Sequence, residues 1–259
     1  NAKINEVIIN EVFADPAPSI GLPESEYIEL YNNTEKLFSL NGWSLTIGSS
    51  EKYFPNAIIE PDSFVVLIKE DAINLFPNNI SKIGFPSISL TNSGSNIILK
   101  DNNGVIINAI SYTDKWYNND NKSDGGWSIE RVNPNLYCET RNNWRASISN
   151  NGGTPGKQNS VFGKNVFSDG FRITKAYIVE DNKIIVHLNK ALDSLLLSES
   201  SYFNINDIPA TNSKPIAPFF DESILTFNFN FLENTTYILS AKELADCSGN
   251  LINNTVQFG

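Results

Sequence analysis

The chain has 259 residues, of which 41% are hydrophobic and 19% are charged, so it is long enough for two ordinary domains and too apolar to be disordered. Its formal net charge of -10 repels phosphate backbones and anionic lipid headgroups, so no nucleic-acid partner is expected. No apolar stretch approaches the roughly 20 residues that a membrane-spanning helix needs, so no membrane span is predicted.

Short apolar runs separated by Gly, Pro, Asn and Asp predict an all-β chain, because long segments with a period of 3.6 are absent. In the first half, the predicted strands are residues 4–12, 27–31, 43–47 and 64–68. The second of these alternates, so that Ile28 and Leu30 face one side while Tyr27, Glu29 and Tyr31 face the other. The fourth is apolar throughout, which suits the interior of a sandwich.

The clearest hairpin is predicted where the strands 96–100 and 105–111 flank Asp101-Asn102-Asn103-Gly104. An Asn-Gly pair supplies the positive φ angles that a tight hairpin turn needs. Short helical turns are predicted only at residues 71–75 and 193–201.

The composition changes at Ser149, where small, turn-forming residues begin and polar sequence continues to about Gly170. We place the domain boundary here, which gives domains at residues 1–162 and 168–259. Strands then resume, and they are predicted at residues 172–179, 183–188, 225–231, 237–241 and near Val256. About 90 residues with roughly seven strands suit an Ig-like sandwich, so we predict two Ig-like β-sandwich domains in tandem.

The two cysteines, Cys138 and Cys247, lie far apart in the sequence and lack the spacing of a metal knuckle. The sequence leaves two states open for them. They are either separate thiols or one disulfide that clamps the two domains together, and a disulfide would imply an oxidising compartment.

Four carboxylates near the start of the chain form a candidate cation site, because calcium prefers oxygen ligands: Glu11, Asp15, Glu26 and Glu29. The alternative, which we favour, is that Glu29 and Asn32 brace loops through hydrogen bonds while Asp15 and Glu26 are solvated.

Two turns also carry acidic side chains. Residues 120–125 resemble an EF-hand loop only superficially, because Lys122 stands where an oxygen ligand is needed. Residues 246–250 read as a turn in which Gly249 has a positive φ angle. We therefore predict no cofactor and no metal, with calcium as the one ion to consider.

His187 is the single histidine, and it lies in a predicted strand with Ile184, Val186 and Leu188 on the opposite face. We interpret it as a structural residue of a strand face. The sequence lacks the residues that triads, zinc motifs, nucleophile elbows and phosphate-binding loops require, so we predict that the chain is not an enzyme.

The polar loop at residues 113–126 holds Trp116 and Tyr117 beside Asp114 and Asp120. An exposed indole next to carboxylate and amide groups can stack on a sugar while those groups bond its hydroxyls. These four residues are the candidate binding site. The alternative is that the rings fold over the end of the sandwich as a plug.

Residues from about 7 to 160 resemble the bacterial form of the lamin tail domain. Seven motifs, in this order, carry the resemblance: Asn10-Glu11-Val12, Glu26-Tyr27-Ile28-Glu29-Leu30-Tyr31-Asn32, Leu40-Asn41-Gly42-Trp43-Ser44-Leu45, Gly125-Gly126-Trp127-Ser128-Ile129-Glu130-Arg131, Asn143-Trp144-Arg145-Ala146, Gly153-Thr154-Pro155-Gly156 and Asn159-Ser160. Residues from about 168 onward resemble a bacterial Ig-like domain of the kind found in S-layer and adhesin proteins, through residues 184–188 and 244–250.

These resemblances imply Ig-type folds for both domains and a protein that is secreted, exposed at the bacterial surface or periplasmic. The lamin tail family has no catalytic residues, so none carries over to this chain. The chain contains no methionine, and we expect it to follow a removed leader or to be cut from a longer chain.

We therefore expect a non-catalytic module for binding or structural spacing in a bacterial envelope protein, with a polysaccharide or a surface protein as partner. One alternative is an accessory fragment of an extracellular hydrolase or nuclease whose catalytic domain lies outside this chain. Another is a purely structural Ig repeat without a ligand. Fold class alone does not decide among these functions.

Overall fold

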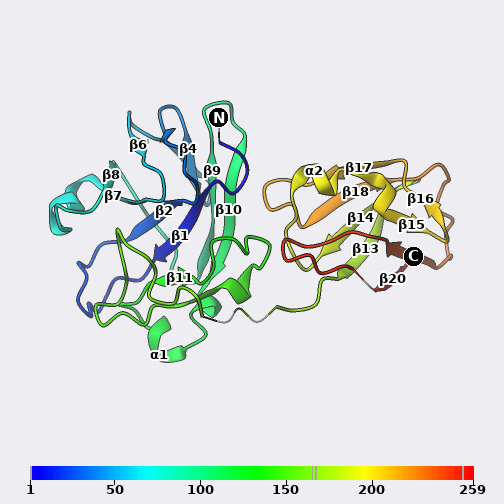
Figure 1. The fold of residues 1–259 in the computed structure, drawn as a ribbon. Helices are drawn as coiled ribbons and strands as arrows, with labels where there is room; N and C mark the ends of the chain where they lie inside the picture. Colours follow the sequence, from blue (N-terminus) through cyan, green and yellow to red (C-terminus); the bar gives the residue numbers. More distant parts are fainter. Residues whose placement is uncertain (1, 165, 167, 253) are drawn as a thin grey trace. The chain divides into compact units, whose positions relative to one another are not determined.

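The computed structural model describes residues 2–164, 166, 168–252 and 254–259, which form two compact units (Figure 1). Unit 1 comprises Asn1–Asn135 and Arg141–Phe167, and unit 2 comprises Leu136–Thr140 and Ser168–Gly259. Almost all regular structure is β, as predicted. The sequence placed residues 136–140 in the first domain, whereas the structure groups them with unit 2, because Cys138 and Glu139 are bonded there. No helix among the described residues is long and apolar enough to cross a membrane.

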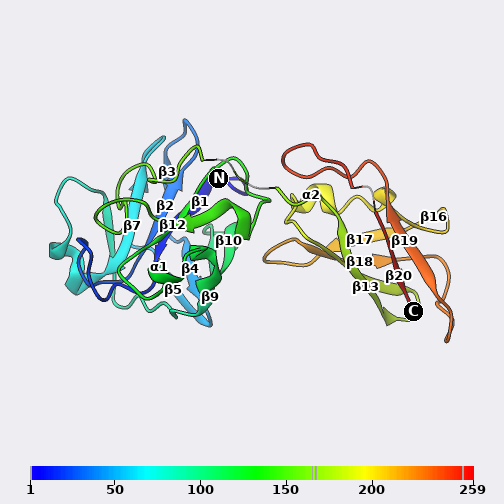
Figure 2. The same cartoon turned by 90° about the horizontal axis from the view of Figure 1, so that it is seen from below.

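Unit 1 contains a six-stranded sheet with the order β12-β11-β1-β2-β7-β8. Its strands are β1 (Val7–Phe13), β2 (Tyr27–Asn32), β7 (Phe64–Lys69), β8 (Lys82–Phe85), β11 (Ile129–Arg131) and β12 (Trp144–Ala146). Neighbouring strands are antiparallel except for β7 and β8, which are parallel. Strands β1, β2 and β7 run side by side in the middle of this sheet (Figure 2).

A second sheet of unit 1 has the order β10-β9-β4-β5. Its strands are β4 (Ser44–Ile47), β5 (Ser50–Tyr53), β9 (Gly94–Lys100) and β10 (Ile106–Thr113). A small ladder joins β3 (Phe38–Ser39) to β6 (Ile58–Ile59). The remaining elements are single turns of helix: η1 (Glu70–Leu75), η2 (Asp114–Tyr117), α1 (Asp120–Ser123) and η3 (Arg141–Asn143).

The two sheets of unit 1 share one apolar core. Ile28 and Leu30 of β2 pack into it together with Leu99 of β9, whereas Tyr27 lies on the other face of the larger sheet in a separate cluster with Phe76. This confirms the predicted alternation of residues 27–31. The hairpin at residues 101–104 also forms, between β9 and β10.

Unit 2 is a sandwich of two four-stranded antiparallel sheets, with the orders β13-β14-β18-β17 and β16-β15-β19-β20. The first sheet comprises β13 (Ile173–Glu180), β14 (Lys183–Leu188), β17 (Asn212–Pro215) and β18 (Glu222–Thr226). The second comprises β15 (Phe203–Ile205), β16 (Ile208–Pro209), β19 (Tyr237–Ala241) and β20 (Thr255–Phe258). Two short helical elements, α2 (Ser194–Leu197) and η4 (Ser200–Tyr202), precede β15, and the Asp193 side chain caps α2.

The strand predicted at residues 225–231 is wrong in its second half. Strand β18 ends at Thr226, because its partner β14 begins at Lys183, directly opposite, and offers no further ladder. The alternation still decides which rings turn inward. Phe227 is buried, and Phe229 and Phe231 pack against it in an aromatic cluster that includes Tyr237 and Phe258.

Candidate functional site

Three glutamates lie side by side on the larger sheet of unit 1, on the face opposite the main core. The strand register places Glu11 of β1 between Glu130 of β11 and Glu29 of β2, and all three residues are fully enclosed. We call them the glutamate row. No ion pair joins the row to a lysine or arginine in the described part of the chain. Because like charges on neighbouring strands repel, the row needs hydrogen-bond donors, protons or both.

Residues 152–161, the closing segment of unit 1, supply many of these donors. The Thr154 amide donates to Oε1 of Glu11 at 2.8 Å, and the Gly156 amide donates to Oε2 of Glu29 at 2.6 Å. Glu130 accepts from the Ser160 hydroxyl and the Val161 amide. The donors outside this segment are the Tyr27 and Ser128 hydroxyls, which bond Glu11, and the Asn10 amide, which bonds Glu29.

The Thr154 hydroxyl indicates where a proton is held. Its Oγ1 lies 3.2 Å from Oε2 of Glu11 and 2.9 Å from Oε1 of Glu130, yet one hydroxyl has one proton to donate. A proton on Oε2 of Glu11 satisfies both contacts, because Glu11 then donates to Thr154 and Thr154 donates to Glu130. Within Glu11, the other oxygen already accepts three hydrogen bonds, from Tyr27, Ser128 and Thr154, so a proton on this residue belongs on Oε2.

The surroundings favour this neutral form. Burial, together with the charge of Glu130, raises the pKa of Glu11 to about 7, against the hydrogen bonds that lower it. Burial and the charge of Glu11 raise the pKa of Glu29 well above its ordinary value. A raised carboxyl pKa marks a general acid when the group faces a cleft. Here the carboxyls are enclosed, so their role is to fasten residues 152–161 to the sheet.

Gly153 is needed for this close fit. A Cβ atom at this position would lie 2.5 Å from the Tyr27 hydroxyl and 2.8 Å from Oε1 of Glu11, which are both too close. The motif Gly153-Thr154-Pro155-Gly156 therefore combines a residue small enough to approach the row with the residue that bonds two of its members.

The four carboxylates near the start of the chain do not share one site. Glu11 and Glu29 belong to the enclosed row, whereas Asp15 and Glu26 are half-exposed. Glu26 accepts the Leu90 amide at 3.2 Å, and burial raises its pKa. The preferred alternative is confirmed for the bracing pair, since Asn32 also donates to the carbonyls of two loops.

Of the two interpretations of Trp116 and Tyr117 that the sequence left open, the structure bears out the plug and not the exposed rings. Both are buried, with 6% and 5% of their surface accessible, and Trp116 packs against Trp144 with the ring centroids 5.2 Å apart. The Tyr117 hydroxyl donates to the Trp127 carbonyl. Although their neighbours in the sequence are polar, both rings pack into the core of unit 1, as the plug alternative describes.

Asp114 and Asp120 are exposed, at the starts of η2 and α1. The rings of Trp116 and Tyr117, which lie between them in the sequence, are buried. In the loop that was compared with an EF-hand, Lys122 donates to the Ser147 carbonyl and lies over the Trp127 ring at 3.8 Å. The ammonium group of Lys122 occupies the position where calcium would need an oxygen ligand, so these residues do not fit a calcium site.

In unit 2, an ammonium group holds two buried carboxylates. Nζ of Lys190 lies 2.6 Å from Oε1 of Glu139 and 2.6 Å from Oδ2 of Asp246, and it also donates to the Ser168 hydroxyl at 2.9 Å. The three protons of the ammonium thus have three acceptors. We call this group the Lys190 cluster. At most 3% of each charged side chain is exposed.

The ion pairs set the titration of this cluster. Burial alone would lower the pKa of Lys190, but Asp246 and Glu139 raise it above its ordinary value. Burial alone would raise the pKa of Asp246, but hydrogen bonds from Lys190 and Asn250 hold it below its ordinary value. Lys190 and Asp246 therefore stay charged near neutral pH.

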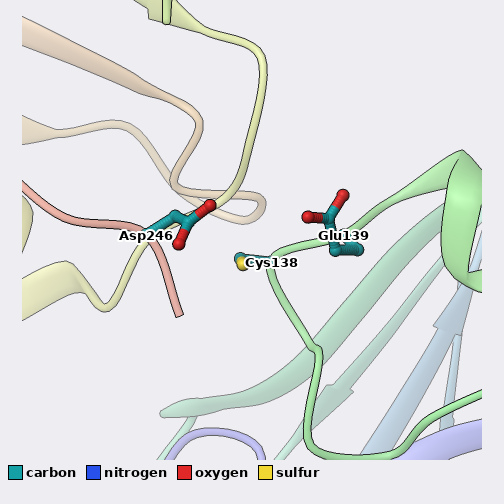
Figure 3. Close-up of side chains that lie close together, drawn as sticks. All are labelled: Cys138, Glu139 and Asp246. Carbon is teal, nitrogen blue, oxygen red and sulfur yellow. The ribbon is translucent and has the colours of Figure 1, made fainter. Parts of the chain in front are cut away.

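Next to this cluster, Cys138 and Cys247 are joined by a disulfide, with their Cα atoms 5.7 Å apart. Of the two states that the sequence left open, the structure contains the bridged one, but both cysteines belong to unit 2, so the bridge does not join the two units as expected. Figure 3 shows Cys138 and Glu139 on one loop, facing the segment that carries Asp246. Their ligand atoms lie within 4.8 Å of one another, which resembles a metal site. Because the sulfur is bridged and Lys190 holds both carboxylates, these residues do not fit a metal ion.

The turn at residues 246–250 is held by the same aspartate. Oδ1 of Asp246 accepts the amides of Ser248 and Asn250, each at 2.9 Å, and Gly249 has φ +81°, which confirms its predicted positive angle. Both oxygens of Asp246 are therefore engaged, so the turn is not suited to calcium.

His187 lies on β14 opposite Glu222 of β18, and its Nδ1 is 2.7 Å from Oε1 of that residue. Its ring also contacts Tyr177. Nε2 is buried and has no hydrogen-bond partner among the described residues. These contacts fit the interpretation of His187 as a residue of a strand face.

The sequence interpretation missed two groups of residues. Lys190 follows β14 in an irregular segment, and nothing in the pattern indicates that it is buried. Tyr31 and Phe64, by contrast, had a signal, because both lie in predicted strands with neighbours that face the core. They line a hollow of about 410 Å³ beside the closing segment of unit 1.

Comparison with known proteins supports the first resemblance over part of its length. A family model described as Lamin Tail Domain matches residues 1–114. The crystal structure of the N-terminal part of the bacterial S-layer protein SbsC is similar to this chain at 14% sequence identity, with a TM-score of 0.31. That similarity covers 34% of this chain and 23% of the SbsC structure. No curated protein matches the sequence.

Proposed function

We propose that this chain is a non-catalytic module of a bacterial envelope protein, located outside the cytoplasm, where it binds a surface polysaccharide or protein or serves as a spacer. The observation that carries the proposal is the bridge between Cys138 and Cys247 beside the enclosed Lys190 cluster. Disulfides persist in secreted, periplasmic and cell-surface proteins and are rare in the cytosol. The match of residues 1–114 to the lamin tail domain agrees with an Ig-type module.

The enclosed ionisable groups support a non-catalytic role. Glu11 and Glu29, whose pKa values are raised far above the ordinary value of a glutamate, have no exposed surface and already bond internal donors. A general acid must reach its substrate within hydrogen-bond distance. These carboxyls are instead bonded to the closing segment of their own unit.

The position of the bridge also suits a spacer. Cys138 and Cys247 are separated by 109 positions, and the segment between them includes every strand of unit 2 except β20. The disulfide gives tension between the two ends of the chain a covalent path that bypasses the backbone between the two cysteines, a stretch that also contains β12 and the closing segment of unit 1. A spacer at a cell surface benefits from such a bypass.

Two measurements on the native protein test the proposal. Antibodies raised against the purified chain are expected to label intact, unpermeabilised cells or to detect the protein in the medium or periplasm. Alkylation before lysis is expected to leave both cysteines unmodified unless a reductant is added. Recovery of the protein from the cytosol with both thiols alkylated would overturn the proposal.

A further inference from the structure

Two aromatic rings stack against each other on the outer face of the larger sheet in unit 1. Tyr31 of β2 and Phe64 of β7 are cross-strand partners, and their rings stack with centroids 4.6 Å apart and planes at 20°. The residues next to them, Leu30 and Val65, point into the core, so the two rings point away from it. Both rings are only partly buried.

The hollow beside these rings is completed by the end of unit 1. Phe162, just after the closing segment, is 48% exposed, and Gln158 and Pro134 lie near it in the same lining. The volume of about 410 Å³ lies within the range of roughly 300–1,000 Å³ that is usual for small-ligand sites. A partly exposed phenylalanine in such a hollow offers an apolar surface that the fold itself does not use.

Polar groups surround these rings. The Asn33 side chain donates to that of Asn135 at 2.9 Å, and the Tyr31 hydroxyl donates to Asp62 at 2.5 Å. Burial and the bond to Asp62 raise the pKa of Tyr31 to about 12, so the phenol stays neutral. Among the described residues of the lining, Asp62 is the one that is charged, and no lysine or arginine lies with it. Amides and one carboxylate can bond hydroxyl groups, whereas the carboxylate repels an anion.

We propose that this hollow binds a neutral polysaccharide, with the Tyr31, Phe64 and Phe162 rings against the apolar face of a sugar and the amides on its hydroxyls. The inference rests on the proposed function and names its ligand class. The hollow is too small for the surface of about 800 Å² per partner that a stable protein–protein complex buries. Acidic polysaccharides are disfavoured by Asp62 and by the net charge of -10.

Affinity gel electrophoresis of the purified, oxidised chain tests this inference. The probes are laminarin, galactomannan, arabinoxylan and dextran, with polygalacturonate as the acidic comparison. We expect at least one neutral probe to retard the chain and polygalacturonate to have no effect. Phe162→Ala should weaken that retardation about tenfold or more, since a stacked ring contributes about 1.4 kcal/mol of binding. Gln158→Ala should weaken it less.

Tyr53→Ala is the matched control, because Tyr53 is an aromatic residue of unit 1 that is 67% exposed and lies on β5, away from the hollow. It should bind like the unmodified chain. Binding that survives Phe162→Ala, or falls equally in Tyr53→Ala, would place the site elsewhere and overturn the inference. If none of the four neutral polysaccharides retards the chain, the inference is overturned as well. The same holds if the chain binds a protein through Phe162 and binds no polysaccharide there. The location and thiol state of the native protein test the proposed function separately.

Discussion

In unit 1, three carboxyl groups are enclosed among hydrogen-bond donors without a cation, whereas in unit 2 two carboxylates are enclosed around the ammonium of Lys190. The glutamate row is stabilised by backbone amides and hydroxyls of the closing segment, and Glu11 keeps its proton up to about pH 7. The Lys190 cluster is stabilised by opposite charge, which raises the pKa of Lys190 and lowers that of Asp246.

The difference shows how burial selects the charge state. A carboxyl group that meets only neutral donors and other carboxyls lowers its free energy by taking up a proton. A carboxylate that meets an ammonium is stabilised in its charged form, but each partner then depends on the other. We therefore expect the glutamate row to tolerate neutral replacements and its stability to depend on pH. We expect the Lys190 cluster to be destabilised by neutral replacements and to depend little on pH near neutrality.

The largest effect is expected for Lys190→Met, which keeps an unbranched chain of similar length but leaves Glu139 and Asp246 buried without a counter-charge. Removal of one member of a buried ion pair costs about 3–5 kcal/mol. Unit 2 should become less stable by this amount, measured as lost amide protection by hydrogen exchange in β14 and β19.

Lys242→Met is the matched control for this variant. Lys242 pairs with Asp207 at 3.4 Å, but both side chains are largely exposed, so the stability of unit 2 should not change measurably. Equal effects of the two variants would mean that the Lys190 cluster has no special role in the stability of unit 2.

Loss of the disulfide is expected to have the next largest effect. The bridge spans 109 positions, for which the chain-entropy model gives about 4.8 kcal/mol, and removal of a native disulfide typically costs about 2–5 kcal/mol. Cys138→Ser combined with Cys247→Ser should therefore destabilise unit 2 and release residues 136–140 from it. Hydrogen exchange of the two variants side by side would show whether the bridge or Lys190 contributes more. No change in protection at residues 136–140 would contradict this expectation.

The pH dependence of unit 1 should be somewhat smaller. The unfolded chain loses the proton of Glu11 near pH 4.5, whereas the folded chain keeps it to about pH 7. Between these values the folded state binds more protons, so its stability falls as pH rises, by about 3 kcal/mol in total for this group. Stability is greatest below about pH 4.5 as far as Glu11 is concerned.

Tryptophan fluorescence during denaturation measures this slope for unit 1 alone, because all four tryptophans of the chain lie there: Trp43, Trp116, Trp127 and Trp144. Lys190 and Asp246 add no slope in this window, since the pKa of Asp246 lies below its ordinary value and that of Lys190 above it. A midpoint that stays constant or rises between pH 4.5 and 7 would show that Glu11 is ionised in the folded chain.

Much of the fold could be predicted from the sequence, because strand alternation reports which face is buried. The alternation at residues 27–31 placed Glu29 opposite the core correctly. It could not show that residues 152–161 cover that face, since this contact joins segments more than 100 positions apart. The sequence likewise left open whether Trp116 is exposed or folds over the sandwich as a plug, and the contact with Trp144 that decides this is tertiary. Local pattern reveals the direction of a side chain but not what lies above it.

The smallest effect is expected for Glu11→Gln at about pH 5. A glutamine can accept the three bonds of Oε1 and donate from its amide nitrogen to Oγ1 of Thr154, as a protonated Glu11 does. Its cost should stay below about 1 kcal/mol, because no buried group loses a partner. At pH 8 the variant should be more stable than the original chain, since it has no proton to lose, and the fluorescence-detected slope should shrink.

Asp246→Asn is the matched substitution in unit 2, since it also replaces a buried carboxyl group by an amide. Glu139 remains as a counter-ion of Lys190, but the charged acceptor Oδ2 of Asp246 is lost, and an amide NH2 group in its place would face the ammonium as donor against donor. The substitution should therefore destabilise unit 2 at both pH values, while Glu11→Gln leaves unit 1 intact at pH 5. If both substitutions destabilise their units equally at pH 5, the glutamate row is ionised like the carboxylates of the Lys190 cluster. A cation that no described residue supplies would then have to balance its charge.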